Sequence, residues 1–135
     1  MIKAKNKNDF SSDILNWYYK NNYGFPWRNN LDPYAIWLSE VMLQQTQTAT
    51  VIPFYNRWLA KLPDIQSVAE SHIDIILKMW EGLGYYNRAR NFHTACKIII
   101  KKHNGKMPRD LLTFSTLPGV GPYISSAVMS IAFNV

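Results

Sequence analysis

Cysteine is nearly absent from this sequence, which has Cys96 alone among 135 residues. A single thiol excludes an internal disulfide framework, and it also excludes an all-cysteine metal or iron–sulfur site built by these residues alone. No apolar run approaches the length of a membrane span, and the first residues lack the apolar stretch of a signal peptide. We therefore expect an intracellular, reducing setting with no membrane contact.

Acidic residues are scarce in the last third of the chain. Residues 1–84 carry eight basic and eight acidic side chains, whereas residues 85–135 carry seven basic ones and a single acid, Asp110. The formal net charge of +6 therefore arises entirely from this last third. A one-sided basic surface favours a polyanion such as nucleic acid, although a solvated helix face would have the same composition.

Alternating β-type patterns are also missing, and apolar residues mostly recur every three or four positions, which predicts an all-α protein. With 47% hydrophobic residues, the chain can bury a core as one domain. Pro53 should open or kink the third helix, and Ser71-His72-Ile73-Asp74 fits a capping box. The expected helices cover residues 10–20, 33–50, 53–61, 64–70, 72–82, 86–103, 110–116 and 122–133.

The segment LPGVGPY at residues 117–123 places two glycines between two helices. Glycines allow a sharp turn and leave the backbone amides of the next helix start open to an anion. This is the layout of a helix-hairpin-helix motif, which grips the DNA backbone without reading bases. A plain tight turn between helices is the alternative.

Glu40 is the one carboxylate of the expected helix over residues 33–50. At helical spacing it shares a face with Ile36, Trp37 and Leu43. Desolvation there would raise its pKa and hold a proton near neutral pH, as a general acid requires. An exposed glutamate at a face boundary is the alternative. The following QQTQ at residues 44–47 suits contacts with base edges, but it also suits an ordinary helix surface.

Aromatic and basic residues follow one another in WEGLGYYNRARN at residues 80–91. Tyr85 and Tyr86 could wedge into or stack on bases, while Arg88 and Arg90 could hold phosphate. A joint between two helices with tyrosines in the core is the alternative.

Together these segments resemble the adenine DNA glycosylases (MutY-type) of the helix-hairpin-helix superfamily. The resemblance runs from FPWR at residues 25–28 to Ala132 and is most specific over residues 34–53. It implies a helical barrel of six helices over residues 31–135, with the hairpin at 110–132, after an N-terminal helix within residues 1–30. It also implies hydrolytic removal of adenine mispaired with 8-oxoguanine or guanine in double-stranded DNA. We expect a monomer that lies in the cytoplasm, nucleoid-associated in a bacterium, or in another intracellular compartment.

The resemblance also implies roles for single residues. Glu40 matches the acid that protonates the flipped adenine, and Tyr123 matches a residue near the reaction centre. Tyr85 matches a tyrosine that wedges beside the oxidised guanine, and Gln45 and Thr46 match residues that contact the mispair. The other expected DNA-binding positions are Arg28, Leu43 and Arg88, together with Gly119, Val120 and Gly121 of the phosphate-binding hairpin.

Tyr123 separates two branches of the superfamily. The endonuclease III branch carries a lysine nucleophile at the matching place, and a tyrosine cannot form the Schiff base that such a lysine forms. We therefore expect a glycosylase without lyase activity. An endonuclease III-like glycosylase/lyase and a non-catalytic helix-hairpin-helix DNA-binding module stay as alternatives.

The family pattern continues past Val135. The resemblance places an aspartate that stabilises the sugar cation a few residues further on, then four cysteines that ligate a 4Fe-4S cluster, and then a C-terminal domain. We therefore expect an N-terminal portion that holds no cluster ligands and no other metal, and that is inactive alone. In such a portion, Ile14 and Trp17 of the first helix would lack their packing partners.

Overall fold

The computed structural model describes residues 26–134, and every regular element in that range is a helix. The all-α prediction is therefore confirmed, whereas the expected helix at residues 10–20 lies outside the described residues. None of the described helices is long and apolar enough to span a membrane. The elements are the 3₁₀ helix η1 (Pro26–Asn29) and the α-helices α2 (Pro33–Leu43), α3 (Thr48–Lys61), α4 (Ile65–Glu70), α5 (Ile73–Trp80), α6 (Asn87–Lys102), α7 (Leu111–Ser115) and α8 (Pro122–Phe133).

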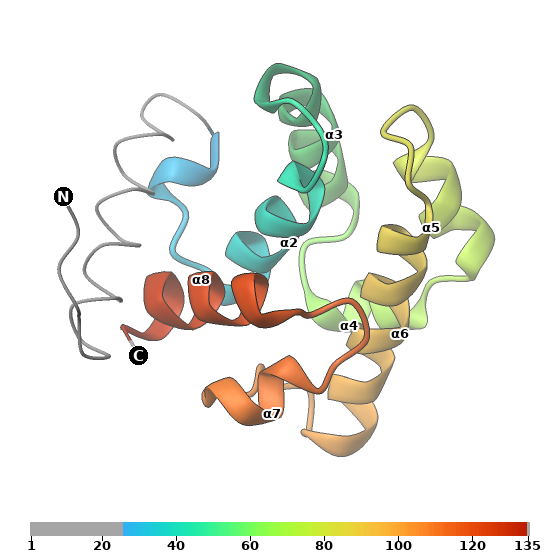
Figure 1. Cartoon of the computed structure of the whole chain (residues 1–135). Helices are drawn as coiled ribbons and strands as arrows, with labels where there is room; N and C mark the ends of the chain where they lie inside the picture. The colour runs from blue at the N-terminus through green and yellow to red at the C-terminus, as the bar shows by residue number, and fades with distance from the viewer. Residues whose placement is uncertain (1–25, 135) are drawn as a thin grey trace, which may run out of the picture.

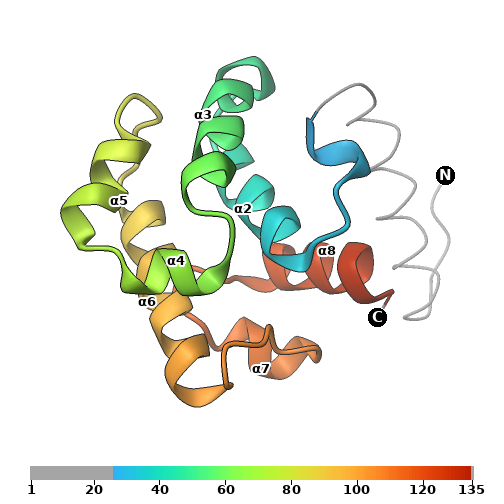
Figure 2. The same ribbon diagram turned by 180° about the vertical axis from the view of Figure 1, so that it is seen from behind.

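Helix α2 lies at the centre of the described fold (Figure 1). It packs against α3, α6, α8 and η1, while α5 and α6 pack together on the side away from η1. The opposite view shows α8 crossing one end of α2, with α7 below it and α4 beside α6 (Figure 2). Helices α7 and α8, with the turn between them, form the expected helix-hairpin-helix unit.

Helix α2 begins where its sequence favours a helix start. The Asp32 side chain accepts a hydrogen bond from the Tyr34 amide at 3.1 Å, and Pro33 occupies the first helical position. Every residue from Tyr34 to Met42 is buried, so α2 has no solvent face along this stretch. A helix enclosed on all sides needs neighbours all round, which explains its central place.

Aromatic rings join these neighbours around α2. Trp37 of α2 contacts Phe92 of α6 and Phe114 of α7, with ring centroids 4.4 Å and 5.4 Å apart. Trp58 of α3 contacts Trp80 of α5 at 5.7 Å and Phe92 at 5.9 Å. Tilted and edge-on pairs of this kind add to the apolar burial of each ring. One aromatic cluster therefore ties five helices together.

The prediction of one helix over residues 33–50 is wrong. Helix α2 ends at Leu43, and α3 begins at Thr48 rather than at Pro53, which lies inside α3. The break falls at Gln45, whose φ of +59° is left-handed and cannot continue an α-helix. The polar residues of this turn carry no apolar periodicity, so the sequence pattern did not reveal the break.

Two helix boundaries also differ from expectation. The capping box expected at residues 71–74 is absent, because His72 caps α5 by accepting from the Asp74 amide through Nδ1 at 3.1 Å. A capping box occurs instead at the start of α4, between Asp64 and Ser67. Helix α5 ends at Trp80, and Gly82 follows in a loop with a φ of +105°.

We expect Tyr34→Phe to destabilise the fold by about 1–3 kcal/mol. The buried Tyr34 hydroxyl donates to the Leu62 carbonyl at 2.6 Å and accepts from Trp58 Nε1 at 2.9 Å, so its loss leaves two buried polar groups unpaired. Urea unfolding followed by tryptophan fluorescence measures the difference. The exposed Tyr86→Phe is the control, and equal stability of the two variants would contradict the role of this hydroxyl.

Candidate DNA-binding and catalytic site

Glu40 is enclosed by the fold although it carries a carboxyl group. It lies three residues from the end of α2, and its side chain is 5% exposed. Burial raises the pKa of the Glu40 carboxyl from 4.5 to about 7, because the charged form is poorly solvated there. At neutral pH both the protonated and the ionised forms of this carboxyl are therefore populated, as a general acid requires.

Tyr123 lies in the first turn of α8, which packs against α2. Its side chain is about half exposed, and its pKa is raised first by burial and then by the nearby charge of Glu40. A phenol with a raised pKa stays protonated at neutral pH, so it offers a hydroxyl rather than a nucleophile. Glu40 and Tyr123 thus sit close enough to interact, although 83 positions separate them in the sequence.

The first half of the turn between α7 and α8 is closely packed, and its second half is open. Gly119 has a φ of +77°, and a Cβ built on it would lie 2.8 Å from Asn91 Cβ on α6. Val120 is buried, and its amide donates to the Leu117 carbonyl. Gly121 is exposed at the start of α8, which has no side-chain cap. The sequence pattern did not identify Asn91 as the surface on which the hairpin packs.

Gln45 and Tyr85 come from different loops but share an unusual backbone. Both have a left-handed φ, +59° for Gln45 and +49° for Tyr85, in residues that are not glycine. Such conformations are costly and tend to occur at functional positions. Both side chains are exposed, and both residues line one open hollow of about 390 Å³ together with Tyr86, Asn87, Arg88 and Arg90. The structure thus brings together two residues that the sequence placed in separate segments.

The guanidinium of Arg88 points into the protein. It lies at the carboxyl end of α2, where the helix dipole favours a cation. Burial lowers the pKa of Arg88, and its Nε is buried with no hydrogen-bond partner among the described residues. Its Nη1 donates to carbonyls at the end of α2 and just after it, those of Val41 (3.0 Å), Met42 (2.9 Å) and Gln44. Its Nη2 donates to Thr46 Oγ1 (2.9 Å) and to the carbonyls of Leu83 (3.4 Å) and Gly84 (3.1 Å).

The remaining expected DNA-binding residues are Leu43, Thr46 and Arg28. Leu43 is the last residue of α2 and is half-buried. Thr46 is half-buried, and its hydroxyl accepts from Arg88. Arg28 lies in η1, which packs against α2, and its side chain is outside the described part of the structure.

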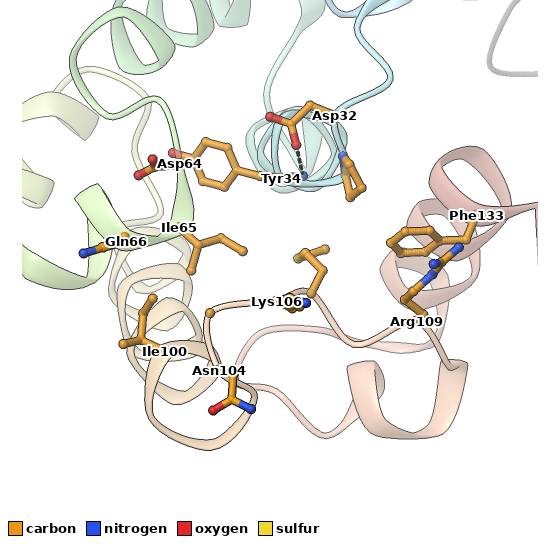
Figure 3. A pocket seen from close by; sticks show the side chains of 13 residues that line it. Asp32, Tyr34, Asp64, Ile65, Gln66, Ile100, Asn104, Lys106, Arg109 and Phe133 are labelled. Carbon is orange, nitrogen blue, oxygen red and sulfur yellow. Dashed lines mark hydrogen bonds between the residues drawn. The ribbon is translucent and has the colours of Figure 1, made fainter.

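A cavity of about 490 Å³ opens elsewhere, between the start of α2, α4, the end of α6 and the end of α8 (Figure 3). Its lining includes neither Glu40 nor Tyr123. Its two carboxylates, Asp32 and Asp64, each cap a helix, and its Arg109 lies over the ring of Phe133. Both carboxylates of this cavity are therefore engaged as helix caps.

The described residues do not fit an iron–sulfur cluster. Cys96 is fully buried on α6, and burial raises the pKa of its thiol. Within residues 26–134, no three cysteine, histidine or acidic side chains gather where a metal could bind. A cluster would have to be held by residues other than these.

The buried Glu40, the basic residues after position 84 and the helix-hairpin-helix unit of α7 and α8 together are typical of a DNA base-excision protein. The profile of the HhH-GPD superfamily of base excision DNA repair proteins matches residues 38–127. The chain therefore belongs to that superfamily, as the sequence resemblance indicated.

Within this superfamily, the chain is similar to curated adenine DNA glycosylases. The chain is 43% identical over 129 residues to an adenine DNA glycosylase of Buchnera aphidicola subsp. Baizongia pistaciae, covering 93% of this chain and 36% of that protein. It is also 43% identical over 134 residues to the mouse (Mus musculus) adenine DNA glycosylase, covering 93% of this chain and 26% of that protein. The chain thus spans about a quarter to a third of the length of these relatives.

Solved structures agree with the fold. A thermostable thymine-DNA glycosylase matches with a TM-score of 0.79 at 30% identity, over 95% of this chain and 59% of that one. Endonuclease III trapped in a covalent intermediate with DNA matches with a TM-score of 0.74 at 26% identity, over 98% of this chain and 62% of that one. The helical fold of this glycosylase superfamily is therefore confirmed.

We expect the stability of the fold to depend on pH through Glu40. The pKa of Glu40 is higher in the folded than in the unfolded chain, so binding a proton at this carboxyl stabilises the folded chain. This stabilisation is complete below pH 4.5 and is lost as the pH rises to about 7. Glu40→Gln removes this titration, so the variant should gain about 3 kcal/mol relative to the native chain between pH 4.5 and 8. Urea unfolding across this range, with the exposed Glu70→Gln as control, measures it. A parallel pH dependence of the native chain and Glu40→Gln would contradict the burial of this carboxyl.

The two hairpin glycines should respond differently to alanine. Gly119→Ala forces a Cβ against Asn91 at a left-handed φ, and we expect a loss of about 1–3 kcal/mol in stability. Gly121→Ala meets open space at a φ of −89°, so its stability should change by less than about 1 kcal/mol. Thermal unfolding of the pair is the measurement, and similar losses for both would refute the packing of Gly119 on α6.

Proposed function

We propose that this chain is the part of an adenine DNA glycosylase that grips DNA and donates the proton for base removal. The substrate would be double-stranded DNA in which adenine is paired with 8-oxoguanine or guanine. One observation carries the proposal: Glu40 is a buried carboxyl whose pKa lies near 7, on the central helix of a base-excision fold. The names of the curated relatives support adenine as the base removed.

The proposed chemistry follows from the bond that breaks. Adenine leaves poorly as an anion, so a proton placed on a ring nitrogen allows it to leave as a neutral base. Glu40 supplies that proton, because at neutral pH a large fraction of its carboxyl is protonated. Tyr123 stays a neutral phenol beside it and offers a hydroxyl rather than a lysine-type nucleophile. The reaction is then hydrolysis without strand cleavage.

The proposed DNA contacts surround this acid. The adenine must leave the stack to reach Glu40, which costs a few kcal/mol. Tyr85, 63% exposed, fills the space beside the opposite base, and Gln45 with Thr46 contacts the mispair. Gly119 and Gly121 hold a backbone phosphate near the start of α8, with the buried Val120 anchoring the turn. Arg28, on η1, and Leu43 complete the contacts.

The described helices α2 and α8 hold no second carboxylate for this reaction. The sugar becomes cation-like as the base leaves, and glycosidases usually answer this charge with a second acid. Glu40 is the single acid of α2, and α8 has none. A non-catalytic DNA-binding module is therefore the second candidate, supported by the seven basic residues after position 84.

An excision assay tests the proposal. Because the chain spans only part of its relatives' length, the complete protein is incubated with a duplex that carries adenine opposite 8-oxoguanine, and abasic sites are then cleaved with alkali. We expect release of adenine that falls as the pH rises above about 7, because Glu40 loses its proton. Glu40→Gln should lower the rate by about 10²–10⁴-fold, the usual contribution of a general acid.

The control for this assay is Glu70→Gln, since Glu70 is exposed on α4. Equal rates for the native protein and Glu40→Gln would refute the role of Glu40. Mispair binding without any adenine release would favour the non-catalytic module. Strand cleavage without alkali would favour a glycosylase/lyase.

A further inference from the structure

The most heavily bonded side chain of the described structure is Arg88, and its bonds converge on two loops. Its Nη2 reaches Thr46 in the loop between α2 and α3 and the Gly84 carbonyl in the loop between α5 and α6. Its Nη1 also bonds the Gln44 carbonyl. The acceptors therefore flank Gln45 on both sides and immediately precede Tyr85.

The two flanked residues are two of the four described non-glycine residues with a positive φ, and the other two are asparagines, which adopt this region more readily. Gln45 and Tyr85 both have a left-handed φ, and such residues persist only when their surroundings hold them. The Arg88 guanidinium carbon also lies 5.6 Å from the centre of the Tyr85 ring, within range of a cation–π contact. One planar group thus holds the backbone around Gln45 and the backbone and ring of Tyr85.

We infer that Arg88 is a positioning residue that latches the Gln45 loop to the Tyr85 loop and thereby sets the shape of the hollow between them. The inference deepens the proposed function, since it rests on Gln45 and Tyr85 meeting the mispair. It replaces the expectation that Arg88 binds phosphate, because the guanidinium donors face protein oxygens and the Nε is buried.

The chemistry of arginine suits this role. Its planar fork of five donors serves several acceptors at fixed angles, whereas a lysine offers three donors on a single nitrogen. A lysine at position 88 keeps the charge and can bond the end of α2, but it cannot reach both loops in the same geometry. The Lys variant therefore separates the latch from a simple charge.

Hydrogen exchange tests the latch without DNA. In Arg88→Met, we expect the amides of residues 44–47 and 83–86 to exchange about tenfold faster or more, because the bonds to both loops are lost. Trp80 Nε1 still donates to the Gly84 carbonyl at 3.0 Å, so one anchor of the second loop remains. Arg90→Met is the matched control, since Arg90 lines the same hollow but its guanidinium bonds Asn87 on its own helix. Unchanged exchange in Arg88→Met would overturn the inference.

Thr46→Val provides a second variant if Arg88→Met does not fold. It removes the side-chain oxygen that Arg88 bonds in the first loop, so exchange should rise most for residues 44–47 and less for residues 83–86, which share the same Nη2 donor. Equal exchange of both loops in Thr46→Val and the native chain would count against the latch.

Binding of mispaired and fully paired duplexes at several salt concentrations supplies the functional readout. We expect Arg88→Lys and Arg88→Met to lose about tenfold in preference for the mispair, while the salt dependence of affinity stays unchanged. A phosphate contact predicts the opposite: Arg88→Met would lower the salt slope by about one, and Arg88→Lys would bind normally. That result overturns the latch. If the native chain binds no DNA, the proposed function fails, while the exchange data still decide the latch.

Discussion

The enclosure of α2 is the constraint on which the rest of this structure depends. A helix buried on every side cannot place a charged group without cost, and α2 carries one carboxyl, Glu40, near its end. In the proposed reaction this cost has a use, because the same burial that destabilises the charged form brings the pKa of Glu40 to about 7. The raised pKa of Glu40 therefore follows from the packing of the core around α2, of which the Trp37–Phe92 contact is a part.

The elements around α2 divide the work of the site between them. Helix α8 brings Tyr123 toward Glu40 and leaves Gly121 open at its own start. The loops on either side of Arg88 present Gln45 and Tyr85 over a shared hollow. The larger cavity near Asp32 and Asp64 contributes nothing to this arrangement, since its carboxylates serve as helix caps. The larger cavity therefore lies apart from the residues of the proposed site, Glu40 and Tyr123.

Much of this architecture was predictable from the sequence, and the failures have physical causes. Apolar spacing revealed most helices, and the neighbours of Glu40 at helical spacing revealed its burial. The end of the helix after Leu43 was not predicted from the sequence, because it depends on the left-handed backbone of Gln45. That backbone is held by Arg88, a residue 43 positions away. The sequence also did not predict that the Arg88 guanidinium faces the protein, because an arginine beside tyrosines fits a phosphate contact equally well. His72 replaced the expected cap because the ring nitrogen of a histidine can accept a backbone bond as a serine oxygen does.

The shared guanidinium of Arg88 also constrains how this surface can evolve. Two loops that depend on one side chain are not independent, so the effects of substitutions in them should not simply add. A change near Gln45 alters the bonds on which the backbone before Tyr85 also relies, and the reverse holds as well. The two segments should therefore drift in concert, and grafting one of them alone from a relative into this chain would transplant half of a coupled unit.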